Sequence, residues 1–282
     1  MIPYVKAETI DEAVRHLADA PRTIVAGCTD YYCRPHARPW ADPVLDISGL
    51  IEARGIADLG DAFRIGALTT WTDLANSELP PQFDALREAA QQVGGVQIQN
   101  AGTIGGNLCN ASPAADGVPA LLILDAQLQV RSATGERRVP LAEFIVGNRQ
   151  TCIQPNELLC ALHVAKRPGR CASRFLKLGA RAYQVISIVM VAALLETDNQ
   201  RRVAHAAIAV GACSAVAQRL STLETTLLGT PLDRAPLSAL VTDAHLASLS
   251  PLDDVRGTAA YRLDAARTLV GRVLDDLQHR LA

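Results

Sequence analysis

Residues 103–116 read TIGGNLCNASPAAD, which combines two adjacent glycines with several small polar side chains. Gly105 and Gly106 have no Cβ, so they can adopt a positive φ and turn their N–H groups toward a ligand oxygen. Side-chain donors surround this pair: Thr103, Asn107, Asn110 and Ser112. Hydrogen bonds to a charged phosphate contribute roughly 1.5–3 kcal/mol each, so a few of them hold a nucleotide firmly. The stretch indicates a nucleotide-binding loop, with an ordinary tight turn as the alternative.

A second glycine-containing segment lies upstream, where residues 23–30 read TIVAGCTD. A short apolar strand there runs directly into Gly27, which is followed by a thiol, a hydroxyl and a carboxylate. Neither segment is a Rossmann fingerprint, because no GxGxxG follows a strand and opens a helix, and the chain has no GKS or GKT of a P-loop. Two such segments can enclose one diphosphate, so we expect a nucleotide that is held in a different way.

Together the two segments resemble those of the flavin-binding subunits of molybdenum hydroxylases, the group that includes xanthine dehydrogenase, carbon monoxide dehydrogenase and 4-hydroxybenzoyl-CoA reductase. Members typically carry AGGTDL, matched here by AGCTDY at 26–31, and (T/S)xGGNxxxxSPxxD, matched by residues 103–116. Further motifs follow in the family's order over nearly the whole chain: VLDIS at 44–48, IGALTT at 65–70, PALL at 119–122, DA at 125–126, FLKLGAR at 175–181 and YR at 261–262. The shared order and spacing support the resemblance.

The resemblance implies an α+β fold, with a two-lobed FAD-binding domain of the molybdopterin dehydrogenase type followed by a small C-terminal domain of one sheet and helices. We expect the FAD-binding domain at residues 1–165, with its two lobes divided near residue 55. The C-terminal flavoprotein domain is expected at residues 170–282. The polar segment KRPGR at 166–170 is the best candidate for the linker between them.

The resemblance also carries over a set of FAD-binding residues. The first segment is expected to wrap the pyrophosphate with Ile24, Val25, Ala26, Gly27, Cys28, Thr29, Asp30 and Tyr31. In the second segment the set includes Gly106 of the glycine pair, Thr103 and Asn107 as ligands of phosphate or ribitol oxygens, and Asp116 as the anchor of a flavin-side or ribityl hydroxyl. Lys177 matches a family lysine near the flavin, with a surface lysine on a strand as the alternative, and Leu159 is expected to line the pocket.

Cys28 departs from the family pattern, because it stands where the second glycine of AGGTDL is usual. If Cys28 needs a positive φ, the strain costs roughly 1–2 kcal/mol, a modest fraction of the binding energy of a tight cofactor. We therefore keep FAD as the expected cofactor, bound noncovalently as in the family.

The function that the resemblance implies is electron transfer within a heterotrimeric molybdenum hydroxylase. A large partner would carry molybdopterin, a small partner would carry [2Fe–2S] clusters, and FAD on this chain would reduce NAD⁺, a quinone or oxygen. The stretch GNLCNASP favours a xanthine or N-heterocycle dehydrogenase over a carbon monoxide dehydrogenase. We assign no catalytic acid or base to this chain, because the cofactor does the difficult chemistry.

Two other functions stay open at this point. One is a stand-alone FAD-dependent reductase or oxidase of the same FAD fold, such as a UDP-N-acetylenolpyruvoylglucosamine reductase. The other is a scaffold subunit that has lost FAD, which the cysteine at position 28 motivates. Bound flavin, and turnover without partner subunits, distinguish the three.

Composition argues against several other classes of protein. The 282 residues are 49% apolar with a net charge of −2, so we expect a globular protein without a basic surface for nucleic acid. The longest apolar stretch, residues 185–195, is shorter than the about 20 residues of a membrane helix. The N-terminus lacks the pattern of a secretion signal, so we expect a cytoplasmic protein.

Cysteine and histidine spacing gives no metal site. The seven cysteines form no CxxC and do not match the spacing of a plant-type iron–sulfur site, so we expect reduced thiols and place the clusters on another chain. The histidines show no metal-ligand spacing, and His36 is interpreted as a solvated loop residue. We therefore assign no metal ligand.

Local patterns predict the elements that carry these segments. TIDE at 9–12 is a capping box that begins a helix, and strands are expected at 23–26 and 44–47. Strands at 56–59 and 63–67 flank Gly60 as a hairpin, and a helix over 86–93 ends at a Gly-Gly pair. Later elements are a strand at 126–130, a hairpin of 186–196 with 203–212, and helices within 216–227 and 261–281.

Overall fold

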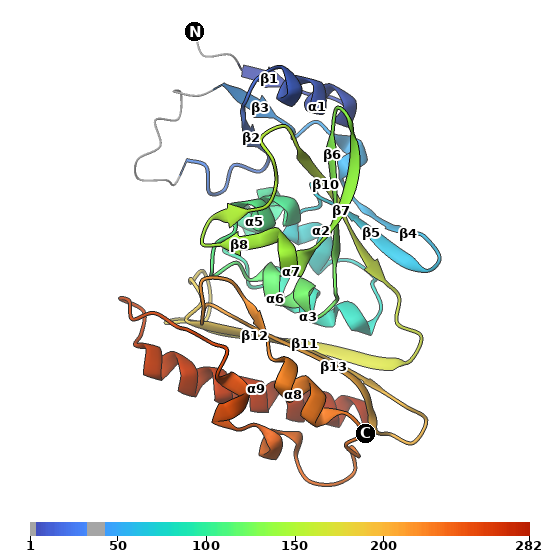
Figure 1. Ribbon diagram of the computed structural model, residues 1–282, viewed down its shortest axis with the longest axis vertical. Coiled ribbons are helices and arrows are strands. Elements are labelled where there is room, and N and C mark those ends of the chain that lie inside the picture. The colour runs from blue at the N-terminus through green and yellow to red at the C-terminus, as the bar shows by residue number, and fades with distance from the viewer. Residues whose placement is uncertain (1–3, 33–42) are drawn as a thin grey trace.

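The computed structural model describes residues 4–32 and 43–282, and within them it has a mixed α and β architecture. Figure 1 shows a small N-terminal sheet at one end, a central five-stranded sheet, and a C-terminal four-stranded sheet with a long helix at the other end. The expected α+β arrangement is confirmed. Two further short strands, β8 (Ile145–Gly147) and β9 (Gln150–Thr151), form a separate ribbon.

The N-terminal sheet is parallel and contains β1 (Tyr4–Lys6), β3 (Val44–Asp46) and β2 (Thr23–Val25) in that order. Helix α1 (Ile10–Asp19) packs on it, and Val14, Leu17 and Leu45 share one buried cluster. The Glu12 N–H donates to the Thr9 hydroxyl at 3.2 Å, which confirms the expected N-terminal cap. β2 is an edge strand, so one of its sides is not paired with a neighbouring strand of this sheet.

The central sheet is antiparallel, in the order β4 (Ile56–Asp58), β5 (Ala62–Gly66), β10 (Leu158–Ala165), β6 (Gln127–Ser132) and β7 (Gly135–Pro140). The expected hairpin of β4 and β5 forms, and Gly60 in its turn has a φ of +95°, which glycine adopts readily. The sequence analysis did not identify β10. Its residues LLCALHVA are buried on both faces except at the end, so the strand lacks an alternating pattern.

Most of the helices precede β6 in the chain. They are α2 (Trp71–Ala75), α3 (Asp84–Ala90), α4 (Val96–Ala101), α5 (Ile104–Asn110) and α6 (Gly117–Leu122), with α7 (Leu141–Phe144) after β7 and short 3-10 helices at Ile51–Ala53 and Pro81–Phe83. The expected helix over 86–93 is α3, which begins two residues earlier and ends at Ala90. The expectation of a loop over residues 103–116 is wrong in part, because α5 lies inside this stretch and α6 begins directly after it.

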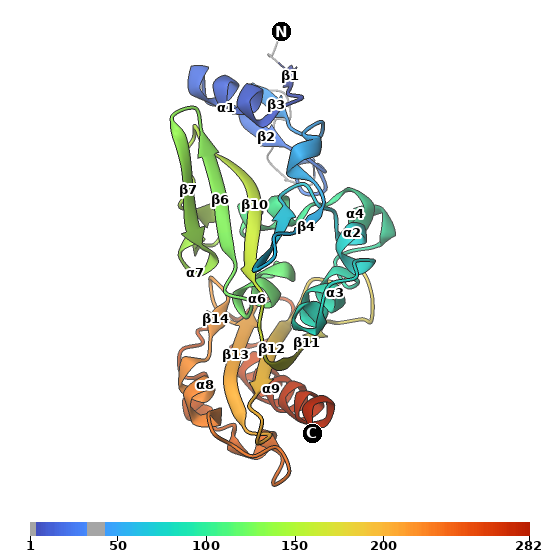
Figure 2. The same cartoon turned by 90° about the vertical axis from the view of Figure 1, so that its right-hand side faces the viewer.

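The C-terminal sheet contains β11 (Arg170–Leu178), β12 (Val189–Thr197), β13 (Val203–Gly211) and β14 (Gln218–Arg219), all antiparallel. The helices α8 (Ser221–Leu227) and α9 (Ala259–Leu281) contact it, as do α3 and α6 from the first half of the chain. Figure 2 shows α8 and α9 alongside these strands. Two 3-10 helices, Leu237–Leu240 and Asp243–Leu246, connect α8 with α9.

The buried position of β12 explains the apolar run at residues 185–195. All but one of the nine residues of β12 are buried, as expected for a strand that is covered on both faces. The expected hairpin of 186–196 with 203–212 is therefore confirmed as β12 and β13, with slightly shorter strands. Among the residues that the structure describes, no helix is long and apolar enough to cross a membrane.

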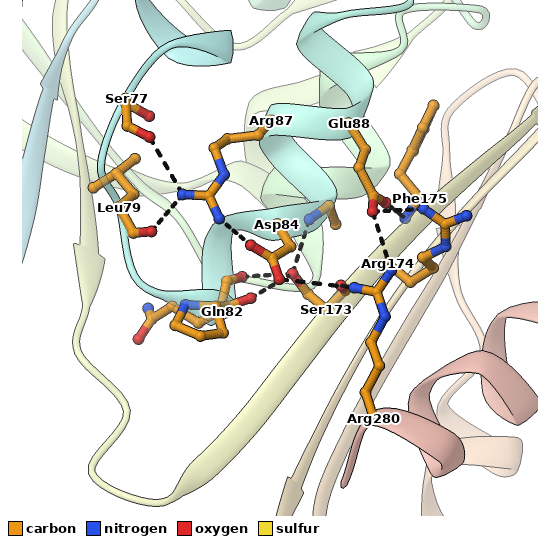
Figure 3. A network of polar contacts seen from close by, with 12 residues as sticks. Ser77, Leu79, Gln82, Asp84, Arg87, Glu88, Ser173, Arg174, Phe175 and Arg280 are labelled. Atoms are coloured by element: carbon orange, nitrogen blue, oxygen red, sulfur yellow. Dashed lines mark hydrogen bonds and ion pairs between the residues drawn. The ribbon is translucent and has the colours of Figure 1, made fainter.

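A polar network joins α3 to β11 and to the end of α9 (Figure 3). The Glu88 carboxylate on α3 accepts hydrogen bonds from the Phe175 N–H at 2.7 Å and from the Arg174 guanidinium at 2.5 Å. Arg280 of α9 lies 3.4 Å from the same carboxylate. Ser173 donates to the carbonyl of Gln82 at 2.9 Å. One carboxylate thus connects segments about 90 and 190 residues away in the chain.

Glu88→Ala is expected to lower the free energy of unfolding by about 2–3 kcal/mol, because it leaves a backbone N–H and a guanidinium without their acceptor. Urea unfolding at pH 7 measures the change. Glu143→Ala on α7 is the control, since Glu143 is exposed and its loss should cost less than about 0.5 kcal/mol. Equal effects of the two substitutions would contradict the role given to Glu88.

Candidate functional site

A cavity of about 850 Å³ brings together segments that are far apart in the sequence. One wall is formed by residues 22–31, a second by residues of α4 and α5, and a third by residues 153–155 and 157–159. The loop between β11 and β12 contributes Arg181, Gln184, Val185 and Ile186. Because β2 lies at one end of the molecule and β11 and β12 at the other, the cavity is shared by both halves of the chain (Figure 1).

The first wall depends on a close approach of two backbones at Gly27. A Cβ added at this position would lie 1.8 Å from the carbonyl oxygen of Ala101, at the end of α4, so no other residue fits there. Cys28 follows with a φ of +56°, so the strain considered for this cysteine in the sequence does arise. Burial raises the pKa of its thiol.

The N–H groups of Gly27 and Cys28 donate no hydrogen bond to any residue within 4–32 or 43–282. A left-handed residue inside a turn is characteristic of the backbone concavities that bind anions through successive N–H groups. Both residues line the cavity. The first segment therefore has the donors that a pyrophosphate requires.

In the second wall, Gly105 and Gly106 do not have the positive φ and the available N–H groups that the sequence predicted. Neither Gly105 nor Gly106 has a positive φ, because both lie in the first turn of α5. The Gly105 N–H donates to the carbonyl of Ala67 at 2.8 Å, and the Gly106 N–H donates to the Thr103 hydroxyl oxygen at 3.0 Å. The prediction that these N–H groups are available to a ligand is therefore wrong.

The two glycines serve close packing instead. A Cβ on Gly105 would lie 2.7 Å from the carbonyl oxygen of Ala67, whereas a Cβ on Gly106 would meet only the Thr103 hydroxyl, at 2.9 Å. Gly106 therefore lines the cavity with its Cα, and no other described side chain occupies the adjacent space. Asn107 also lines the cavity, and its buried side-chain oxygen has no hydrogen-bond partner among the described residues.

Asp116 and Lys177 form a buried ion pair beside the cavity. The Lys177 ammonium lies 2.6 Å from one carboxylate oxygen of Asp116, and the two side chains are only 5% and 8% exposed. Ser187 donates to the other carboxylate oxygen at 2.6 Å, and Lys177 also donates to the carbonyl of Gln92 at 3.2 Å. Burial raises the pKa of the Asp116 carboxyl, and Lys177 and Ser187 act against that shift.

Most residues named from the sequence reach this cavity. Lining residues include the whole of the first segment and five others: Thr103, Gly106, Asn107, Asp116 and Leu159. Lys177 is not a lining residue, and the alternative of a surface lysine is wrong because its side chain is buried against Asp116. His36 and Cys33 lie outside the described residues.

Other lining residues had no signal in the sequence. They include Arg22, Ile98 and Gln184. Gln184 has a φ of +49°, and its side chain lies against Gly95, so it comes close to the beginning of α4 only through the folded loop. In the part of the chain that the structure describes, no group of three or more His, Cys, Asp or Glu side chains is arranged to hold a metal ion.

The residues present fit FAD as a ligand. The cavity lies between two halves of the chain, and two groups that line it lack a hydrogen-bond partner in the part of the chain that the structure describes. They are the N–H donors of the turn at Gly27 and Cys28, and the side-chain oxygen of Asn107. Its size falls within the range of cofactor sites in proteins. A dinucleotide of this kind needs polar contacts in its middle and apolar walls at its ends, and the lining residues supply both.

Comparison with known families gives two matches that together cover most of the chain. Residues 1–166 match the FAD binding domain in molybdopterin dehydrogenase, and residues 174–277 match the CO dehydrogenase flavoprotein C-terminal domain. The xanthine dehydrogenase FAD-binding subunit of Escherichia coli O157:H7 is 31% identical over 97% of this chain and 94% of its own length. The nicotinate dehydrogenase FAD-subunit of Eubacterium barkeri is 29% identical over 99% of this chain and 96% of its own.

The fold has a close match among solved structures. A chain of the carbon monoxide dehydrogenase from Hydrogenophaga pseudoflava superposes with a TM-score of 0.91 at 27% identity, covering 100% of this chain and 98% of that chain. The fold and cavity thus define a flavoprotein subunit of an oxidoreductase. More specifically, the chain belongs to the family of FAD-binding medium subunits of the molybdenum hydroxylases.

Gly27→Ala and Gly106→Ala are expected to separate a packing role from a binding role. Gly27→Ala should lower the free energy of unfolding without FAD by at least about 2 kcal/mol, because its Cβ meets backbone at 1.8 Å. Gly106→Ala should lower the free energy of unfolding by only about 1 kcal/mol, because its Cβ disturbs the Thr103 cap. It should nevertheless weaken FAD binding at least about tenfold, because its Cβ enters the cavity. Urea unfolding and FAD titration of both variants test this, and the reverse order of stabilities would refute it.

Lys177→Met is expected to destabilise the protein by about 3 kcal/mol at pH 7, because it leaves the Asp116 carboxylate buried without its cation. The variant raises the pKa of Asp116 further above its value in the unfolded chain. Such a carboxyl favours the folded state at low pH and opposes it as the pH rises, so the loss should shrink toward pH 4.

The double variant Asp116→Asn/Lys177→Met is the control for that pair. It should lose less stability than the sum of the two single variants, and it should lack the pH dependence that the Asp116 carboxyl gives to Lys177→Met, because it has no carboxyl at position 116. Additive losses in urea unfolding would show that the two side chains do not act as a pair.

Proposed function

We propose that this chain binds FAD along the cavity and uses it to move electrons from [2Fe–2S] clusters of a partner subunit to NAD⁺ or another acceptor. The observation that carries the proposal is the turn at Gly27 and Cys28, which lines a cavity shared by both halves of the chain and whose two N–H groups have no partner among residues 4–32 and 43–282. Family membership supports the cofactor, and the arrangement of the lining residues supports its site.

Each wall of the cavity has a task in this proposal. Residues 24–31 hold the pyrophosphate, chiefly through the N–H groups of Gly27 and Cys28. The Thr103 hydroxyl and the Asn107 amide bind phosphate or ribitol oxygens, and Gly106 leaves room for them. Asp116 accepts a hydrogen bond from a hydroxyl near the flavin, and Leu159 is an apolar wall.

Lys177 acts through Asp116 in this scheme. Its ammonium keeps the carboxylate ionised and in place, while Ser187 fixes the second oxygen. Bound FAD supplies the redox chemistry, since a flavin accepts electrons singly and passes them on in pairs. The chain itself contributes binding, orientation and exclusion of water, so no acid or base of its own is required.

The partners and the division of the chain are part of the proposal. The FAD-binding domain comprises residues 1–165 in two lobes that divide near residue 55, and the C-terminal flavoprotein domain comprises residues 170–282. A relative is named the medium chain of a carbon monoxide dehydrogenase and another a subunit of a dehydrogenase complex, which supports a heterotrimer with a molybdopterin subunit and an iron–sulfur subunit. The six described cysteines are free, which suits the reducing cytoplasm.

We assign the complex to the oxidation of xanthine or another N-heterocycle. Support comes from two relatives at 29–31% identity, which are named FAD subunits of a xanthine dehydrogenase and a nicotinate dehydrogenase. The carbon monoxide dehydrogenase medium chain of Hydrogenophaga pseudoflava is 28% identical over 85% of this chain, a shorter match. The substrate itself would meet the molybdenum partner rather than this chain.

The test of the proposed function is the visible spectrum of the purified chain, with FAD titration if it is colourless. We expect noncovalent FAD that acid releases, and negligible NADH or substrate turnover until the partner subunits are added. A folded chain that binds no FAD at saturating concentration would refute the proposal. Turnover without partners would instead support a stand-alone enzyme.

Cys28→Gly is expected to tighten FAD binding by up to about tenfold, because glycine removes the left-handed strain at φ +56° in the turn that meets the pyrophosphate. Cys28→Val should weaken binding, since a β-branched residue tolerates this conformation poorly. Titration by flavin fluorescence compares the two variants with wild type. A tighter Cys28→Val variant would contradict this account of the turn.

A further inference from the structure

Arg22 lies immediately before β2 and lines the same cavity. Its Nε donates to the carbonyl of His16, near the end of α1, at 3.3 Å. That bond restricts the orientation of the planar guanidinium, because the three nitrogens of the group move together. A backbone carbonyl of α1 therefore holds Arg22 at the cavity wall.

The Arg22 guanidinium has a second nitrogen without an acceptor among the described residues. Its Nη1 is buried and has no hydrogen-bond partner within the described residues, 4–32 and 43–282. Burying a charged donor without an acceptor is unfavourable, and such a group in a folded protein calls for an ion, a water or a ligand. The side-chain oxygen of Asn107 is a second buried, unpaired atom in the lining of this cavity. Two residues that line one cavity thus each have a buried polar atom without a partner among the described residues.

The position of Arg22 along the cavity selects the part of the ligand that it meets. A strand advances about 3.3 Å per residue, so the Cα of Arg22 is separated from that of Gly27 by up to roughly 16 Å. The proposed pyrophosphate contacts are at Gly27, and the proposed flavin contacts are at Asp116, beside Lys177 and Ser187 of the C-terminal half. Figure 1 shows β2 in the opposite, N-terminal part of the molecule. Gly27 lies against the end of α4, whereas the Arg22 guanidinium is bonded to α1, so we place Arg22 on the side of the pyrophosphate away from the flavin.

We propose that Arg22 binds the adenosine half of FAD, donating from Nη1 to a ribose oxygen or an adenine ring nitrogen. This inference rests on the proposed function. Adenosine offers neutral acceptors and an aromatic face, both of which suit a guanidinium. The contact makes Arg22 a specificity residue, because FMN has the flavin and one phosphate but no adenosine.

The experiment compares FAD and FMN binding to the full apo chain by flavin fluorescence, for wild type, Arg22→Met and Arg22→Lys. Arg22→Met should weaken FAD binding about 10- to 100-fold and leave FMN binding within about twofold of wild type. Arg22→Lys should recover part of the loss, since it keeps a cationic donor. Arg15→Met is the matched control, because Arg15 also donates its Nε to a backbone carbonyl of α1 but does not line this cavity.

A thermal melt of each apo variant separates binding from folding. Arg22→Met removes an unsatisfied buried donor, so its apo melting temperature should stay within about 2 °C of the Arg15→Met control. A lower apo melting temperature with equal losses for FAD and FMN would assign Arg22 a structural role and overturn the proposal. So would unchanged FAD affinity. Failure of wild type to bind FAD would refute the proposed function and, with it, this inference.

Discussion

The ion pair of Asp116 and Lys177 is the interaction on which the site depends. The carboxylate comes from the turn that opens α6, and both side chains that satisfy it come from the C-terminal sheet and its loop. A buried carboxylate is costly without its cation, so this ion pair favours the arrangement in which the two halves of the chain meet here. The loop of residues 181–186 follows Lys177 and is thereby brought to the cavity.

Close backbone contacts determine the shape of the other walls. Gly27 lies against the end of α4 and Gly105 against Ala67, and neither position has space for a Cβ. These contacts depend on the small size of glycine and not on its ability to adopt a positive φ. In the turn after Gly27, the residue with a positive φ is Cys28. Packing of this kind brings three separate segments to one cavity without a Rossmann or P-loop motif.

Local sequence patterns predicted many of the elements correctly. The cap at Thr9, the hairpin at Gly60 and the hairpin of β12 with β13 depend on neighbouring residues, so short-range rules are sufficient for them. The strand β10 and the helices α4 and α5 were missed. β10 is buried on both faces and has no alternation, and α4 has no buried residue at all, so neither has the periodicity by which an element is recognised.

The sequence by itself determined the family, the cofactor class and most of the residues that line the cavity, because ordered motifs retain their spacing along the chain. Only the tertiary structure decided how those residues act. In the folded chain the N–H groups of Gly105 and Gly106 donate to other groups of the protein, and Lys177 is buried against Asp116. The tertiary structure also brought Arg22 and Gln184 to the cavity. The physical reason is that hydrogen-bond partners and burial are set by segments distant in the chain, and no local pattern records them.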